Sequence, residues 1–139
     1  MNVLILDDDK FRHEYFASVY RCSEDDLVVH AYRYSEFVTH LRSGVKWDII
    51  YLDHDLGDLV ANADYYVDGW GSKQPYNGKH AAAAICELDD VDLPREVIIQ
   101  SVNGPGSHAM LAMLKRRFDH LDVNVSWQPF GESTLLIRH

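Results

Sequence analysis

The chain has 139 residues, of which 47% are hydrophobic and 25% charged, and this fits one globular domain with a single core. Its formal net charge of −9 argues against binding along a nucleic-acid duplex, because an acidic surface repels a polyanion. No apolar run approaches the roughly 20 residues that span a bilayer, which argues against a membrane protein.

The N-terminal segment predicts a buried first strand. Residues 3–6 are apolar and run directly into Asp7, Asp8 and Asp9, without the basic region of a signal peptide. We therefore expect a cytoplasmic protein. Cys22 and Cys86 have no metal-ligand spacing, and in that compartment we expect both thiols to be reduced.

Short apolar runs alternate with helically spaced apolar residues along the rest of the chain. Further strands are predicted at 27–31, 49–52, 97–99 and 123–127, and helices at 11–19, 34–41, 81–88 and 110–118. The tail at 134–138 fits either a strand or one helical turn. This alternation predicts a doubly wound α/β fold, with a parallel sheet covered by helices on both faces.

Residues 58–77 interrupt the alternation. Tyr65, Tyr66, Trp70 and Tyr76 lie there among Gly, Asp and Asn, which predicts a long loop with a short ribbon inserted into one domain that spans 1–139. The aromatic rings could stack on a base or pack the loop onto the domain.

Polar residues follow four of the predicted strands at their carboxyl ends. Asp7–Asp9 follow the first strand, Asp53–Asp55 the third, Ser101–Asn103 the fourth and Gln128 the fifth. Ligands of parallel α/β sheets bind beyond these ends. The pattern therefore predicts one site that joins carboxylates, a hydroxyl and two amides.

Carboxylates gathered so closely repel one another unless a cation neutralises them. Mg²⁺ prefers oxygen ligands and keeps waters or phosphate in its shell, and Mn²⁺ suits the same ligands. We expect Asp7, Asp8 and Asp53 to bind such an ion. Helix capping is the alternative; it fits Asp9, which precedes a helix start, whereas metal binding is favoured for Asp8 and Asp53.

The order of these residues resembles the receiver domain of bacterial response regulators. The similar segments are Leu6–Asp8, Tyr51–Asp53, Ser101 and Gln128–Phe130, and they extend over nearly the whole chain. The resemblance implies a flavodoxin-like, receiver-like sheet of five strands in the order 2-1-3-4-5. It also implies that Asp7 and Asp8 are the metal-binding pair, Asp53 the phosphoryl-acceptor position and Ser101 the hydroxyl. Gln128 replaces the family's Lys, and a neutral amide cannot supply that positive charge.

Two more departures separate the chain from ordinary receivers: the long loop after Gly57 and the lack of a strong helix after Phe130. The cyclic-phosphate-processing receiver domains of bacteria and phages are more similar. The similar segments are Asp53–Gly57, Asn77–His80 and Ser101–Gly106, the last with one extra residue before its Pro. This resemblance implies activity on cyclic phosphates of nucleotides or RNA ends.

His54 is the candidate general acid or base, because it lies between Asp53 and Asp55 at a strand end; a structural hydrogen-bond donor is the alternative. Contacts to phosphate oxygens are expected from four residues: Ser101, Asn103, Gln128 and His80. For His80, at a helix start, a plain surface position is favoured over a ligand contact.

The glycines at 104 and 106 could turn backbone N–H groups toward an anion, but an ordinary turn with Ser107 as helix cap is the favoured interpretation. His108, after these glycines, has the same two interpretations as His80. The other five histidines are interpreted as structural or solvated: His13, His30, His40, His120 and His139.

We therefore expect a Mg²⁺- or Mn²⁺-dependent phosphoesterase or nucleotide-processing protein that acts on a cyclic or terminal phosphate of a small nucleotide or RNA end. Asp7, Asp8 and Asp53 would hold the metal, and catalysis would rest on His54 with Asp53 and Asp55. The alternative is a degenerate receiver that binds a protein partner and catalyses nothing. Gln128 disfavours an ordinary phosphorelay receiver, and the Asp-x-Asp resemblance to haloacid-dehalogenase phosphatases lacks their later basic and acidic residues.

Overall fold

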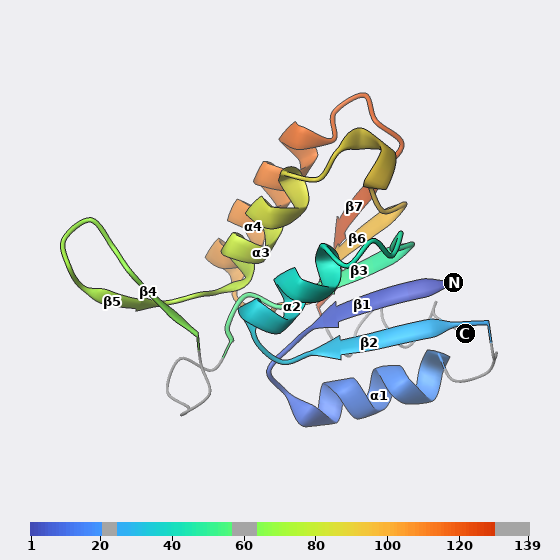
Figure 1. Cartoon of the computed structure of the whole chain (residues 1–139), viewed down its shortest axis with the longest axis horizontal. Coiled ribbons are helices and arrows are strands. Elements are labelled where there is room, and N and C mark those ends of the chain that lie inside the picture. The colour runs from blue at the N-terminus through green and yellow to red at the C-terminus, as the bar shows by residue number, and fades with distance from the viewer. Residues whose placement is uncertain (21–24, 57–63, 130–139) are drawn as a thin grey trace.

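The computed structural model describes residues 1–20, 25–56 and 64–129. Five parallel strands form the central sheet in the order β2-β1-β3-β6-β7 (Figure 1). Their bounds are Asn2–Leu6 for β1, Leu27–Ala31 for β2, Ile49–Leu52 for β3, Glu96–Ile99 for β6 and Asn124–Trp127 for β7. Counted along the chain, this is the order 2-1-3-4-5, so the predicted receiver-like topology is confirmed.

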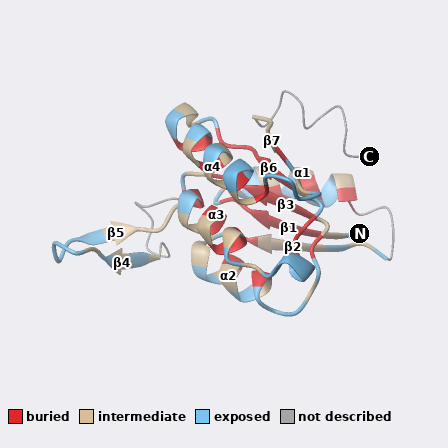
Figure 2. Ribbon diagram, turned by 90° about the horizontal axis from the view of Figure 1, so that it is seen from above, coloured by how far each residue is buried: buried red, intermediate tan, exposed pale blue. Residues whose placement is uncertain are grey.

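Helices cover both faces of the sheet because alternate strand residues point to opposite sides. Leu4 and Leu6 of β1 pack in the core beneath α2 (Tyr34–Leu41), α3 (Gly78–Cys86) and α4 (Gly104–Arg117). Val3 and Ile5 pack instead with residues of α1 (Lys10–Tyr20). The strands β1, β3 and β6 of the central sheet are the most deeply buried part of the molecule (Figure 2). A short 3-10 helix, Asp90–Asp92, follows α3.

A β-hairpin projects from the domain between β3 and α3 (Figure 1). Its strands β4 (Tyr65–Val67) and β5 (Lys73–Pro75) pair antiparallel, which confirms the ribbon predicted within 58–77. At its base the ring of Tyr76 stacks on Tyr34 of α2, with centroids 4.2 Å apart, so aromatic contacts join the hairpin to the helical face.

Several predictions fall on residues outside the described ranges: Cys22, Gly57, the region from Phe130 onward and the tail at 134–138. Cys86 is a half-buried free thiol. No helix in the described ranges is long and apolar enough to cross a membrane.

Candidate functional site

The acidic residues come together because their strands are neighbours in register. Leu6 of β1 pairs with Leu52 of β3, and Asp7 and Asp53 follow these two residues directly. The Asp53 N–H donates to the Leu6 carbonyl at 2.9 Å. Carboxylate oxygens of Asp7, Asp8 and Asp53 all lie within 4.8 Å of one another, which is close enough to share one metal ion.

Arg12 is the residue of this site that sequence reasoning missed. Its Nε and Nη2 donate to the two oxygens of Asp7 at 2.6 and 2.8 Å, and Nη2 also donates to Asp53 at 3.3 Å. Arg12 lies in the first turns of α1, four residues after Asp8. That i,i+4 spacing across a helix start was the available signal, because it places a cation near the strand end.

Burial sets the proton affinity of the cluster. Loss of water, followed by the charge of Asp7, raises the pKa of Asp53 to about 8, although Arg12 acts in the opposite direction. Burial and Asp7 also raise the pKa of Asp8, which is the exposed member of the group. A cation on these oxygens stabilises their ionised forms, so proton and metal compete for the same site.

The donor set suits a hard divalent cation, since it offers three carboxylates. A fourth oxygen lies close by. Gln100 donates Nε2 to Asp7 Oδ2 at 2.8 Å, and its Oε1 is buried without a hydrogen-bond partner in the described ranges. A buried amide oxygen without a partner is uncommon, and this acceptor is available to a ligand or a water.

His54 lies beside the cluster with its ring held by polar neighbours. Nδ1 is 2.8 Å from Asp55 Oδ1, and its backbone N–H donates to Asp53 Oδ1 at 2.9 Å. Asn103 Nδ2 lies 3.3 Å from both His54 Nδ1 and Asp55 Oδ1. Because Nδ1 has one position for a hydrogen bond, we assign Nδ1–H as donor to Asp55, and the Asn103 amide as a second donor to that carboxylate.

Two glycines allow helices to approach His54 from either side. A Cβ on Gly106 would overlap the His54 ring, and a Cβ on Gly78 would overlap the Asp53 carbonyl and lie 2.8 Å from His54 Cα. The Gly78 N–H donates to the His54 carbonyl at 2.8 Å. The first turns of α3 and α4 therefore enclose the loop that carries His54.

Asparagines cap both helices. Asn77 accepts from Lys79 N–H and Asn103 accepts from Gly106 N–H, each at 2.9 Å. The prediction that Ser107 caps the second helix is wrong. Ser107 is buried inside α4, where its hydroxyl donates to the Ser101 carbonyl, because the helix already begins at Gly104. The predicted cap at Asp9 is confirmed by its bonds from Phe11 and Arg12 N–H.

Of the other predicted site residues, Ser101 lies beside Asn103 at the site, whereas the side chains of Gln128 and His80 bond elsewhere. Ser101 is buried next to Asn103, whose backbone N–H donates to the Ser101 hydroxyl at 3.0 Å. Gln128 follows the end of β7, its side chain donates to Ser126 of that strand at 3.0 Å, and no bond joins it to the acidic cluster among the described residues. His80 Nδ1 accepts from Asn77 N–H in a capping box, and its ring packs 5.0 Å from Tyr66 and Tyr76. Burial lowers the pKa of His80.

His13 contacts the acidic cluster through the backbone of Asp7. It is buried, its Nε2 donates to the Asp7 carbonyl at 2.7 Å, and Nδ1 is 2.7 Å from Nδ1 of His30. These bonds agree with the structural role predicted for both histidines.

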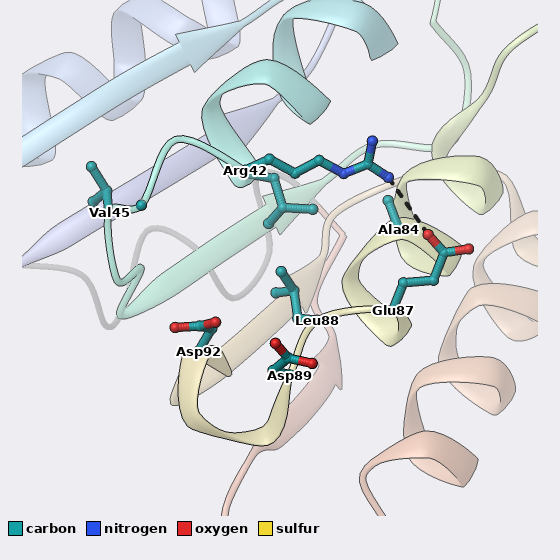
Figure 3. A pocket seen from close by; sticks show the side chains of 9 residues that line it. Arg42, Val45, Ala84, Glu87, Leu88, Asp89 and Asp92 are labelled. Carbon is teal, nitrogen blue, oxygen red and sulfur yellow. Dashed lines mark ion pairs between the residues drawn. The ribbon is translucent and has the colours of Figure 1, made fainter.

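A cavity of about 400 Å³ lies elsewhere, between the C-terminal ends of α2 and α3 (Figure 3). Arg42 and Glu87 form an ion pair of 3.5 Å across it. The first residue of α3, Gly78, contacts His54, whereas the last turn of α3 borders this cavity. The cavity therefore lies away from the carboxyl ends of the strands, and none of the predicted site residues lines it.

Two solved structures share the fold of this chain. A response regulator from Burkholderia pseudomallei, solved with a phosphorylated aspartic acid, a calcium ion and citrate, is 18% identical with a TM-score of 0.61, over 99% of this chain and 65% of that one. The N-terminal domain of a response regulator/sensory box/GGDEF three-domain protein from Carboxydothermus hydrogenoformans is 17% identical with a TM-score of 0.59, over 98% of this chain and 87% of that one. No curated protein sequence matches the chain.

These identities are low, so the two structures establish the fold alone, and the chain spans less than two thirds of the Burkholderia protein. The family assignment comes from the sequence. Residues 2–116, which include β1, α1 and the loops that carry Asp53 and Asn103, match the cyclic-phosphate processing receiver domain. The chain therefore belongs to the family of cyclic-phosphate processing receiver domains.

Proposed function

We propose that the protein is a divalent-metal-dependent phosphoesterase that hydrolyses a cyclic or terminal phosphate of a small nucleotide or RNA end. The observation that carries the proposal is the pair of His54 and Asp55, 2.8 Å apart and adjacent to the Asp53 carboxylate. A receiver that only accepts a phosphoryl group on an aspartate has no need of an oriented imidazole at this position.

The Asp55 carboxylate orients the imidazole. With Nδ1–H donated to Asp55, the second ring nitrogen Nε2 has its lone pair available, and it makes no hydrogen bond to a described residue. In hydrolysis the water oxygen bonds to phosphorus, the ester P–O bond breaks and the leaving oxygen takes a proton. Nε2 can remove the proton from water and return it to the leaving oxygen. Asp55 stabilises the imidazolium formed between these two transfers.

The surrounding groups suit a phosphate. The N-terminal ends of α3 and α4 both lie against the His54 loop, and helix N-termini favour anions. Ser101 and Asn103 place a hydroxyl and an amide beside the same loop. Asp7, Asp8 and Asp53 would hold Mg²⁺ or Mn²⁺, which offsets negative charge on phosphoryl oxygens when bound.

The test is turnover of 2′,3′-cyclic nucleotides and of RNA oligomers with a cyclic phosphate end, each with Mg²⁺ or Mn²⁺. His54→Ala should lower turnover by roughly 10²–10⁴ and leave metal binding intact, the usual size of a general acid–base contribution. His40→Ala is the control, because His40 lies in the last turn of α2, the end of that helix that borders the separate cavity. Equal turnover by wild type and His54→Ala would contradict the assigned role.

A non-catalytic receiver is the second candidate, and two observations favour it. Arg12 already neutralises part of the acidic cluster, and Gln128 supplies no charge and turns its side-chain amide to Ser126 of β7. If metal-loaded wild-type protein hydrolyses none of these substrates but binds a specific protein partner at the Asp53 edge, this second function replaces the first.

A further inference from the structure

Asp7 is fully hydrogen-bonded in this structure, so it can bind a metal ion only when one of these bonds is released. Oδ1 accepts from the Asp9 N–H and from Arg12 Nη2, both at 2.8 Å. Oδ2 accepts from Arg12 Nε at 2.6 Å and from Gln100 Nε2 at 2.8 Å. A carboxylate has about four lone-pair positions, so these four bonds occupy Asp7 fully. With 0% of Asp7 exposed, water contributes nothing further.

Arg12 extends from Asp7 toward the other two carboxylates. Its Nη2 lies 3.3 Å from Asp53 Oδ2 and 3.8 Å from Asp8 Oδ1. The guanidinium thus reaches all three carboxylates whose oxygens could share one ion. In the described ranges, Arg12 is the only basic side chain that forms an ion pair with any of them.

A guanidinium and a divalent cation cannot both neutralise the same oxygens at full strength. The bidentate bond to Asp7 is the stronger one, because two short parallel N–H···O bonds form there. The contacts with Asp53 and Asp8 are longer and single, and the Arg12 side chain is 27% exposed. When Nη2 leaves Asp53 and Asp8 it also releases Asp7 Oδ1, while the 2.6 Å bond from Nε to Asp7 Oδ2 still holds the side chain at the site.

We propose that Arg12 is a built-in counter-ion that a divalent metal displaces from Asp8 and Asp53, and that the displaced guanidinium then binds the phosphate group. This inference rests on the metal dependence in the proposed function. It adds a positioning and specificity residue that exchanges carboxylate partners for phosphate when the metal binds. The positive charge of Arg12 would then become available to a phosphate only after the metal has replaced Arg12 on Asp8 and Asp53.

The test uses two neutral variants, Arg12→Gln and Arg12→Met, with Arg12→Lys as a charge-preserving variant. Arg42→Gln is the matched control, since Arg42 pairs with the exposed Glu87 far from the cluster. Mn²⁺ affinity is measured by electron paramagnetic resonance and calorimetry at fixed pH. The neutral variants should bind Mn²⁺ at least about tenfold more tightly than wild type, because a positive charge beside a doubly charged ion is gone. Arg12→Lys and Arg42→Gln should stay near wild type.

Inorganic phosphate in saturating Mg²⁺ provides the second arm. The neutral variants should bind phosphate several-fold more weakly, although they bind metal more tightly. General damage to the site would weaken both, so the opposite signs identify the exchange. If a variant is destabilised, its metal-induced rise in melting temperature is measured instead, and it should exceed the wild-type rise.

Equal or weaker Mn²⁺ binding by both neutral variants would overturn the proposal, and unchanged phosphate binding would overturn its second half. These results are separable from failure of the proposed function. Arg12 can compete with metal in a protein that hydrolyses nothing, in which case only the turnover assay fails. If no variant binds Mn²⁺ at all, both the metal dependence and this inference are wrong.

Discussion

Gly78→Ala tests whether the N-terminus of α3 holds the His54 loop as tightly as the structure indicates. The new Cβ would overlap the Asp53 carbonyl and lie 2.8 Å from His54 Cα. These neighbours are backbone atoms at the end of the central strand β3, so they cannot rotate away. The helix must move outward, and the bond from Gly78 N–H to the His54 carbonyl, 2.8 Å long, is stretched.

The expected loss of stability follows from three contributions. Overpacking against a rigid neighbour costs about 1–3 kcal/mol, and a lost backbone hydrogen bond costs about 1 kcal/mol. Replacing Gly by Ala returns up to about 1 kcal/mol through the entropy of the unfolded chain. The net free energy of unfolding should therefore fall by about 1–3 kcal/mol.

Urea unfolding followed by circular dichroism, without metal, measures this free energy from the midpoint and slope. Gly69→Ala is the control, because a Cβ there meets no heavy atom within 4 Å and the residue has no positive φ. We expect Gly69→Ala to match wild type or to exceed it slightly. If Gly78→Ala is as stable as Gly69→Ala, the close approach of α3 to the strand end is wrong.

Three further predictions concern Asp53. Mg²⁺ or Mn²⁺ should raise the melting temperature of wild type, and Asp53→Ala should abolish that rise; an equal rise in both would exclude Asp53 as a ligand. Because the pKa of Asp53 is raised from 3.8 to about 8, the folded state holds a proton that the unfolded state releases. Metal-free stability should therefore decrease as the pH rises between these two values, and Asp53→Asn should flatten the decrease; identical pH profiles in urea unfolding would contradict the shift. Acetyl phosphate or beryllofluoride should leave little stable adduct on Asp53, because Gln128 supplies no charge, and stoichiometric phosphorylation in mass spectrometry would show that the site accepts a phosphoryl group without a Lys at this position.

The opposing charges of the site have a consequence for how it operates. The single guanidinium of Arg12 offsets only part of the charge of the three carboxylates, and a proton on Asp53 offsets a further part before any ligand arrives. Such a site attracts a metal only as far as the metal can outcompete both a proton on Asp53 and the Arg12 bonds. Metal affinity and phosphate affinity are therefore expected to depend on each other.

The arrangement of strands and the gathering of the aspartates could be predicted from the sequence alone. Apolar runs that alternate with helical patterns specify a parallel sheet, and in such a sheet every strand ends at the same edge. Asp7 and Asp53 follow the ends of two strands, and the strand order implied by the receiver resemblance makes these strands neighbours, so no side-chain contact had to be known to bring the two residues together.

Only the tertiary structure decided which neighbours these groups have. The Arg12 bonds depend on the direction in which α1 leaves β1, and a residue pattern does not encode that direction. The exclusion of a Cβ at Gly78 and Gly106 depends on how closely the first turns of α3 and α4 approach Asp53 and His54. The cap at Asn103 in place of Ser107 depends on the residue at which α4 begins, which is the least predictable property of a helix. Strand ends are set by local pattern and topology, whereas partners across elements are set by packing, and that difference divides what the sequence determined from what it could not.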